Sequence, residues 1–322
     1  MKPQTDVHFD EAELLATLRA DVALGLTDAA KWLPPHWFYD EQGCHLFDEI
    51  TRQPEYYPTR CEREILTAHA EEIAFATGVK TLVELGSGSS DKTRLLLDAF
   101  TRQGSLGAFA PIDIAAGQLR SSVDRLGTDY PGLELHGVVA EFTGRLDRLP
   151  EGGDRMVALL GGTLGNLLPG QRGRFLTRLR TMLDPGEWLL VGVDLVKDPD
   201  ILVAAYDDDA GITARFNRNV LHVINHRLGA DFEPDAFEHR VEWDEGCEWI
   251  EMRLRATRPM NVSIPGADLA VGFWADEEVS TEVAAKFRPE GIAAELSVAG
   301  FEVRGWWTDD KEWFGTALAE AI

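Results

Sequence analysis

The sequence has 322 residues, of which 44% are hydrophobic, and its 55 Asp and Glu against 31 Lys and Arg give a formal net charge of −24. This length predicts either one enlarged domain or two domains that share a cleft. Because such a negative field repels a phosphate backbone and an anionic membrane alike, the charge favours a small-molecule substrate over nucleic acid.

Membrane, secretory and metal-binding classes find no support in the sequence. No apolar run reaches the roughly eighteen residues of a membrane span, and the N-terminus lacks the basic and apolar regions of a signal peptide, so we expect a cytoplasmic protein. Cys44, Cys61 and Cys247 lie far apart, which predicts free thiols. The eight His residues form no H-E-x-x-H or comparable cluster, so we expect no metal site.

The N-terminal part predicts two helices separated by an aromatic stretch. Apolar residues recur at helical spacing over Asp10–Leu24, Gly25 is placed to end that helix, and Leu33–Pro35 prevents its return. An aromatic stretch interrupted by prolines, Trp37–Pro58, comes next. A second helix is expected over Thr59–Ala76.

Short apolar runs then alternate with helical segments. They lack strict polar alternation, as strands covered on both faces should, and therefore predict a doubly wound, parallel α/β sheet. The runs are Thr81–Leu85, Ala108–Ile112, Leu133–Val139, Met156–Leu160 and Trp188–Val193.

The alternation breaks over residues 196–286 and returns after Phe287. Within the break we expect a helix near Asp198–Asp207 and strands at Trp249–Ala256 and Val262–Ile264. After it we expect a helix and two strands. They are Pro289–Ala299, Phe301–Thr308 and Trp313–Ala319. The sheet domain is therefore expected to be interrupted by an inserted α+β lobe.

A glycine-rich turn between the first expected strand and the next helix is the sharpest local signal. In Val83–Thr93, Gly86 and Gly88 permit a sharp turn and close approach of a ligand to backbone N–H groups. The dinucleotide fingerprint needs a third glycine, or an alanine, where this chain has Asp91. S-adenosyl-L-methionine carries a sulfonium and no phosphate, so acidic residues near the turn suit it better than a pyrophosphate.

Carboxylates follow the next two expected strands. Asp113 at a strand end can accept both ribose hydroxyls of a nucleoside, although it can also cap the following helix. Glu141 and Phe142 can hold an adenine, although alone they also fit a solvated acid beside a core ring. Ligands of this architecture bind at the carboxyl ends of strands, which favours a common site.

The chain resembles the histidine Nα-methyltransferases of ergothioneine biosynthesis over nearly its whole length. The matching stretches are Lys31–Tyr39, Leu46–Arg60, Thr81–Thr93, Gly165–Leu167, Asp194–Lys197, Ala205–Asp208 and Thr281–Pro289. The resemblance implies an α/β fold of class I (Rossmann-like) methyltransferase type, a doubly wound sheet with an inserted α+β substrate-binding lobe. Residues 61–195 and 287–322 would form the S-adenosylmethionine-binding domain, and residues 1–60 and 196–286 the lobe.

The same resemblance implies site residues and the reaction. Cofactor contacts would fall on Gly86, Lys92, Asp113, Glu141 and Phe142, and the acceptor pocket on Tyr39, Tyr56, Gly161, Asn166, Tyr206, Met252 and Glu282. Tyr56 and Asn166 would position the α-amine, with Tyr39 as the third catalytic candidate. Tyr206 would hold the carboxylate and Glu282 an imidazole N–H. Three methyl transfers would convert L-histidine to its trimethyl betaine, hercynine.

The sequence departs from the family pattern at two positions. Glu141 stands where the family typically has Asp, which predicts a small shift in cofactor affinity. Ala284 stands where members that grip the imidazole from both sides have Ser, and the lost hydroxyl predicts histidine affinity lower by roughly two- to tenfold.

Alternatives remain open for the residues and for the whole chain. A buried Tyr can merely satisfy its hydroxyl, Asn166 can cap a turn, and Glu282 can be solvated. The chain could act on another amino acid or a modified histidine, bind S-adenosylmethionine without catalysis, or be a nicotinamide-dependent oxidoreductase. We expect a monomer that acts on a small amino acid and binds neither nucleic acid nor membrane.

Overall fold

The computed structural model describes residues 4–7, 11–141 and 153–322 and divides them between two compact units. The first unit comprises Met1–His8, Pro58–Val196 and Ala285–Ile322, and the second comprises Phe9–Tyr57 and Lys197–Ala284. Residues 4–7, which the sequence-based division places in the lobe, form a strand of the first unit's sheet.

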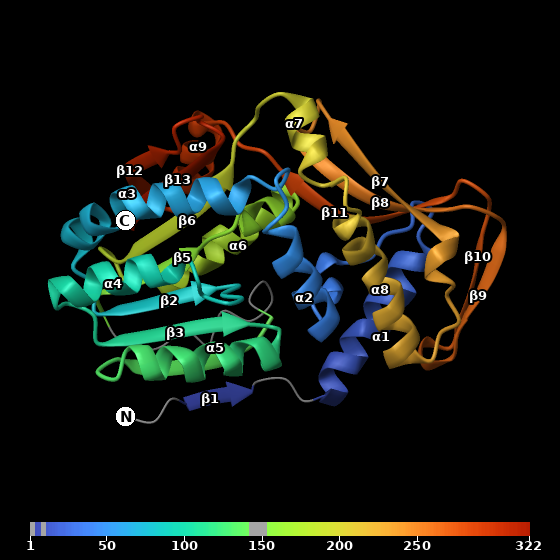
Figure 1. The fold of residues 1–322 in the computed structure, drawn as a ribbon, viewed down its shortest axis with the longest axis horizontal. Coiled ribbons are helices and arrows are strands. Elements are labelled where there is room, and N and C mark those ends of the chain that lie inside the picture. Colours follow the sequence, from blue (N-terminus) through green and yellow to red (C-terminus); the bar gives the residue numbers. More distant parts are fainter. Residues whose placement is uncertain (1–3, 8–10, 142–152) are drawn as a thin grey trace. The chain divides into compact units, whose positions relative to one another are not determined.

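An eight-stranded sheet forms the centre of the first unit (Figure 1). In spatial order its strands are β1 (Gln4–Val7), β4 (Glu134–Val139), β3 (Ala108–Asp113), β2 (Thr81–Leu85), β5 (Arg155–Leu159), β6 (Trp188–Asp194), β13 (Phe314–Ala321) and β12 (Phe301–Thr308). The first six are parallel, whereas β13 is antiparallel to both neighbours.

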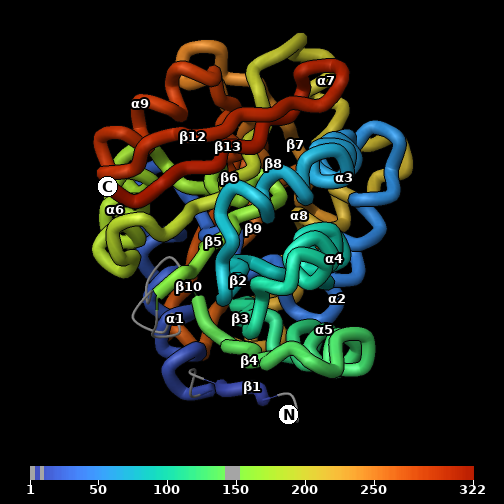
Figure 2. Tube along the Cα trace, turned by 90° about the vertical axis from the view of Figure 1, so that its left-hand side faces the viewer, coloured from blue at the N-terminus to red at the C-terminus, as the bar shows by residue number. Residues whose placement is uncertain are grey.

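Helices cover both faces of this sheet, as the apolar strands predicted. The helices are α3 (Pro58–Thr77), α4 (Thr93–Gln103), α5 (Ala116–Asp129), α6 (Pro169–Met182) and α9 (Pro289–Ala299), with the short 3-10 helix η2 (Thr163–Asn166). Helices α3, α4 and α5 lie on one face and α6 and α9 on the other (Figure 2). All five residues of β5 are buried. The predicted doubly wound α/β fold is confirmed.

The strand order reverses between β2 and β5. After β2 the chain moves outward through β3 and β4, and then returns to the other side of β2 to form β5 and β6. The connections after β2 and β5 therefore leave the sheet in opposite directions at its carboxyl edge, where ligands of open α/β sheets bind. Gly86 follows β2 directly, and Gly161 lies two residues after β5.

The second unit combines helices with two small sheets. Its helices are α1 (Glu11–Thr27), α2 (Glu41–Ile50), α7 (Pro199–Ala204) and α8 (Ile212–Leu228), with the 3-10 turns η1 (Pro35–Phe38), η3 (Pro234–Ala236) and η4 (Pro265–Ala267). One sheet has the order β11 (Glu278–Ala285), β8 (Trp249–Ala256), β7 (Phe237–Asp244). The other pairs β10 (Leu269–Phe273) with β9 (Met260–Ile264).

Helix α8 lies at the centre of the second unit's core. Its buried residues Val220, Ile224 and Leu228 recur every four positions and therefore lie on one face. They join a hydrophobic cluster with residues of α1 and of both small sheets. Burial of this stripe stabilises the helix, since propensity alone contributes little.

The prediction that Gly25 ends the first helix is wrong, because α1 continues to Thr27. Gly25 is instead needed for a close approach. A Cβ on it would lie 2.0 Å from the carbonyl oxygen of Trp32, whose N–H donates to the Gly25 carbonyl at 3.1 Å. The glycine lets the returning chain pack against the last turn of the helix.

Candidate functional site

The turn after β2 uses left-handed backbone at both predicted glycines. Gly86 has φ 70° and Gly88 has φ 51°, values that side chains with a Cβ rarely adopt. The Gly86 N–H donates to Ile112 O at 2.8 Å, which ties the turn to β3. A Cβ on Gly88 would meet no atom within 4 Å. The space beside Gly88 is open, as a ligand that approaches this backbone requires.

Asp113 lies at the end of β3 and faces the same turn. Its Oδ2 accepts the Gly88 N–H at 2.8 Å, and its Oδ1 accepts the Ala115 N–H at 2.9 Å. Burial raises the pKa of Asp113, and backbone N–H groups of Ala115, Gly88 and Ile114 oppose that shift. The carboxylate can still accept hydrogen bonds beyond those from the backbone. Asp113 thus shapes the turn and the start of α5 and can still accept the two hydroxyls of a ribose.

Other groups around the turn also fit S-adenosyl-L-methionine. The hydroxyl of Ser87 is buried and, within the part of the chain that the structure describes, has no hydrogen-bond partner. A buried polar atom of this kind suits a polar ligand group. Glu141 lies two residues beyond β4, and Phe142 lies outside the described residues.

Lys92 and Gly161 are brought together by Glu62, a residue that the sequence analysis missed. Glu62 lies on α3, is fully buried, and forms an ion pair with Lys92. Both of its carboxylate oxygens accept the Gly161 N–H at 2.9 Å. The sequence did hold a signal, since Glu62 shares the buried face of α3 with Ile65 and Leu66. A carboxylate at such a position needs compensating partners.

Asn166 lies at the end of η2, where Gly165 permits a close packing of the chain. A Cβ on Gly165 would lie 2.7 Å from the carbonyl oxygen of Ala285. The residues Gly165–Leu167, singled out in the sequence, therefore include a glycine required by packing and the asparagine assigned to the acceptor. Asn166 and Gly161 belong to the first unit together with the glycine turn.

Three predicted acceptor residues come together in the second unit as a tyrosine cluster, defined as Tyr39, Phe47, Tyr56 and Tyr206. Ring centroids are 5.8 Å apart for Tyr39 and Phe47, 6.1 Å for Phe47 and Tyr56, and 6.4 Å for Tyr56 and Tyr206. Each pair packs edge to face, the arrangement that aromatic quadrupoles favour. Met252 of β8 belongs to the same hydrophobic core.

Tyr39 is held by its neighbours in the chain. Asp40 begins α2 by accepting the Gly43 N–H at 2.8 Å. The amide nitrogen of Asn219, on α8, donates to Asp40 Oδ1 at 2.8 Å and to Phe38 O at 2.9 Å. Residues on both sides of Tyr39 are therefore fixed to α8, which limits the positions that its ring can take.

Glu282 and Ala284 lie two residues apart on β11, so strand alternation directs their side chains to one face. Both are buried. The fold thus groups Gly86, Lys92, Asp113 and Gly161 at the carboxyl edge of the large sheet. It groups Tyr39, Tyr56, Tyr206 and Met252 in the core of the second unit.

A reversed strand order, a glycine turn with open space and a half-buried Asp at the next strand end are features of a class I S-adenosyl-L-methionine-dependent methyltransferase. The profile of the family described as "Histidine-specific methyltransferase, SAM-dependent" matches residues 18–321, and the chain belongs to this family.

Several proteins that are similar to this chain have names that refer to histidine methylation or to ergothioneine biosynthesis. The chain is 53% identical over 302 residues to the Histidine N-alpha-methyltransferase of Mycolicibacterium smegmatis, covering 94% of each chain. It is 50% identical over 312 residues to the protein of that name from Mycobacterium tuberculosis, covering 97% of each. It is 31% identical over 242 residues to Ergothioneine biosynthesis protein 1 of Schizosaccharomyces pombe, covering 71% of this chain and 31% of that one.

Proposed function

We propose that this chain transfers methyl groups from S-adenosyl-L-methionine to the α-amine of L-histidine and forms Nα,Nα,Nα-trimethyl-L-histidine, hercynine, in the first step of ergothioneine biosynthesis. Family membership and the names of the bacterial and fungal relatives support the acceptor and the pathway. The observation that carries the proposal is the tyrosine cluster, because its chemistry fits an amine that becomes a quaternary ammonium.

The faces of aromatic rings attract a methylated ammonium. A ring is also methylated less readily than a more basic side chain would be. A cation within about 6 Å of a ring centroid is stabilised by the ring quadrupole, most strongly when water is excluded. Tyr56 is buried, and Tyr39 and Tyr206 pack against the same core. A phenol also accepts a hydrogen bond from an amine N–H. The cluster thus suits the amine before each transfer and the cation after it.

The reaction needs orientation more than a strong base. When bound, S-adenosyl-L-methionine supplies an electrophilic methyl on its sulfonium. The amine must be neutral and in line with that methyl, so its proton has to leave before transfer. We assign positioning of the amine to Tyr56 and Asn166 with Tyr39, the carboxylate to Tyr206, and an imidazole N–H to Glu282. Gly161 and Met252 complete the proposed set of acceptor residues.

For the cofactor we assign the ribose hydroxyls to Asp113, whose carboxylate can accept further hydrogen bonds, and backbone contact to Gly86. Lys92, Glu141 and Phe142 complete the proposed set. The ion pair between Lys92 and Glu62 keeps the lysine near the chain that follows β5.

Ala284 is the residue that favours a substrate other than histidine as the methyl acceptor. It is buried on β11, and its methyl offers no hydrogen bond to an imidazole. A different amino acid or a modified histidine is therefore the competing substrate. Ala284→Ser should raise histidine affinity by roughly two- to tenfold if histidine is the acceptor, because it restores one hydrogen bond.

The substrate is proposed to be a small molecule. Among the described residues, no helix has the length and apolar character needed to cross a membrane. A monomeric state and a cytoplasmic location remain predictions from the sequence.

The test is mass spectrometry of products after incubation of the protein with S-adenosyl-L-methionine and each of the twenty amino acids. Trimethylated histidine alone is the expected product. Transfer to a different amino acid would keep the methyltransferase and reject histidine. Tyr56→Phe and Asn166→Ala should each lower turnover with histidine, and full turnover in both would refute the assigned positioning of the amine.

A further inference from the structure

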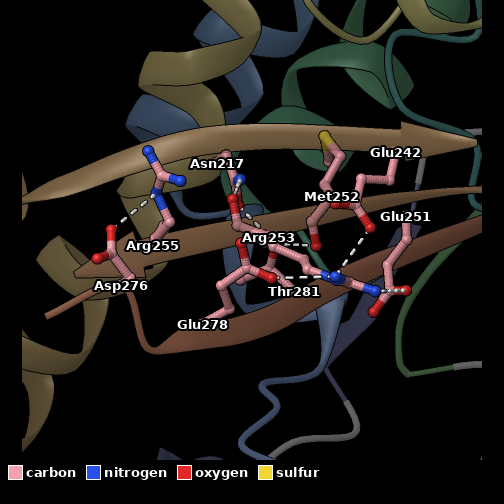
Figure 3. Close-up of polar contacts among 9 residues, drawn as sticks. All are labelled: Asn217, Glu242, Glu251, Met252, Arg253, Arg255, Asp276, Glu278 and Thr281. Carbon is pink, nitrogen blue, oxygen red and sulfur yellow. Dashed lines mark hydrogen bonds and ion pairs between the residues drawn. The ribbon is translucent and has the colours of Figure 1, made fainter. Parts of the chain in front are cut away.

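A buried chain of polar side chains runs through the second unit beneath its three-stranded sheet. We call it the Asn217 network; it consists of Asn217 on α8, His239 on β7 and Thr281 on β11. Asn217 is completely buried, Thr281 is 1% exposed, and the His239 side chain is 4% exposed. Figure 3 shows Asn217 and Thr281 pointing toward one another beside Met252. Most polar groups this deep in a protein have a hydrogen-bond partner.

The hydrogen-bond partners of Asn217 and His239 determine which atom donates and which accepts in each bond. Asn217 Nδ2 donates to Arg253 O at 3.1 Å, which fixes the orientation of the amide, because the flipped amide would place two oxygens together. The same nitrogen lies 2.8 Å from His239 Nδ1, so this ring nitrogen accepts. Nε2 must then carry the proton of the neutral ring, and it donates to Tyr206 O at 2.8 Å.

The other end of the network leads to β8. Asn217 Oδ1 lies 2.7 Å from the Thr281 hydroxyl, and that hydroxyl lies 2.9 Å from Met252 O. The single hydroxyl proton is shared between these two acceptors. One continuous set of hydrogen bonds therefore joins the main chain at Tyr206 to the main chain at Met252.

The network ends at residues that the proposed function assigns to the amino acid. His239 holds the carbonyl of Tyr206, Thr281 holds the carbonyl of Met252, and Glu282 follows Thr281 directly on β11. Tyr206 is also fixed from its other side, since Asp208 accepts the Ile212 and Thr213 N–H groups at the start of α8. Small shifts in the network would move all three residues.

The ion pairs on the same sheet are of another kind. Arg253 contacts Glu242, Glu251 and Glu278, but its side chain is 28% exposed (Figure 3). Ion pairs open to water contribute little and tolerate adjustment. The Asn217 network instead lies where an unmade hydrogen bond leaves a buried group unsatisfied.

We infer that Asn217, His239 and Thr281 are positioning residues of the amino-acid site, which set the affinity for the acceptor by fixing Tyr206, Met252 and Glu282. The inference rests on the proposed function. It assigns no contact with the reacting atoms to these residues. Their loss should raise the KM for the amino acid while kcat changes little. The reason is that the enzyme would bind the amino acid less tightly in the ground state and in the transition state by the same amount.

The experiment compares Thr281→Val, which keeps the shape and removes the hydroxyl, with Thr281→Ser, which keeps the hydroxyl. The matched control is Thr316→Val. Thr316 is also completely buried in a strand, and its hydroxyl has no hydrogen-bond partner within the described part of the chain. For each variant we would measure KM and kcat with histidine, binding of S-adenosylhomocysteine by calorimetry, and the melting temperature.

Thr281→Val should raise the KM for histidine by about three- to tenfold, the effect of one buried hydrogen bond. Thr281→Ser should restore most of the native KM, and all variants should bind S-adenosylhomocysteine as the native chain does. An unchanged KM in Thr281→Val would overturn the positioning role alone. Equal losses of histidine and S-adenosylhomocysteine binding would show a structural role and also overturn it. A native chain that binds S-adenosylhomocysteine yet methylates no histidine would refute the proposed function, and the inference with it.

Discussion

Glu62 is a charged residue without contact to water. Two partners compensate it, the Lys92 ammonium and the Gly161 N–H. Removing one member of a buried pair leaves the other charge uncompensated, which costs more than the pair contributes net. Glu62→Gln should therefore lower the free energy of unfolding by about 3 kcal/mol and weaken binding of S-adenosylhomocysteine.

Urea denaturation and calorimetry would check this prediction. Glu71→Gln is the control, since Glu71 lies on the same helix with its side chain 78% exposed and paired to Arg102. That change should alter the free energy of unfolding by less than about 1 kcal/mol. Equal effects of the two substitutions would contradict the role assigned to Glu62.

Glu84 predicts a pH dependence of stability. Burial raises its pKa to about 8 from the usual 4.5, and the hydrogen bond from Thr93, 2.6 Å long, opposes the shift only in part. Between these pH values the folded protein keeps a proton that the unfolded chain has lost. The free energy of unfolding contributed by Glu84 is thus fully present below pH 4.5 and is lost as pH rises through about 8.

Glu84→Gln imitates the protonated side chain. It should therefore remove the contribution of Glu84 to the change of the free energy of unfolding with pH. Relative to the native chain, the variant should become more stable as the pH is raised from about 5 to about 8. Chemical denaturation over that range measures the difference. Parallel curves for the two chains would show that Glu84 is ionised in both states.

Residues of the site differ in how far the sequence reveals them. Gly86, Gly88 and Asp113 are predictable because local turn chemistry fixes their roles. The partners of Glu62 and Thr281 are not predictable, because they lie far away in the chain: Glu62 binds Gly161, and Thr281 binds Asn217. Only the folded chain brings such partners together.

At the scale of elements, the connection through η2 gives a prediction about packing. Gly165→Ala would place a Cβ 2.7 Å from the Ala285 carbonyl oxygen. The nearest atoms, the O and N of Ala285, belong to the backbone, so relief requires movement of β11 or η2. We expect the free energy of unfolding to fall by about 1–3 kcal/mol.

The control is Gly173→Ala in α6, where a Cβ would meet nothing within 4 Å. There the change should stabilise the protein by about 0.5–1 kcal/mol, because alanine favours a helix interior. Thermal and urea denaturation would test the opposite signs. A stabilised Gly165→Ala protein would show that the chain after β5 can move freely.

Elements with a simple pattern were predicted well. β2, β8, α9 and β12 have the expected bounds, since apolar runs or clear end signals delimit them. Helix α8 and strands β7, β10 and β11 were not predicted. The buried positions of α8 include Asn217 and Asn219, which hide its apolar stripe. In β7 only Phe237 is buried, and half-buried residues then alternate with exposed, mostly charged ones. Their pairing depends on tertiary contacts that override local preference.

For the whole molecule, the net charge of −24 predicts a dependence on salt. Repulsion among carboxylates destabilises the compact state, and salt screens it over a Debye length of about 10 Å at 0.1 M. The melting temperature should rise between about 0.02 and about 0.5 M sodium chloride. The effect should be smaller toward the isoelectric point near pH 4.6, and a fall with added salt would contradict the prediction.

The position of β13 also bears on synthesis of the protein. β13 lies inside the sheet, between β6 and β12. It is nevertheless the last strand to be translated, and it follows the whole second unit. Until then β6 is paired on one side only, and its other edge can pair with a second chain. Because translation adds only about 5–20 residues per second, the nascent protein spends seconds in this state. A premature stop before residue 314 would make the open edge permanent, so truncated products should aggregate rather than accumulate as folded fragments.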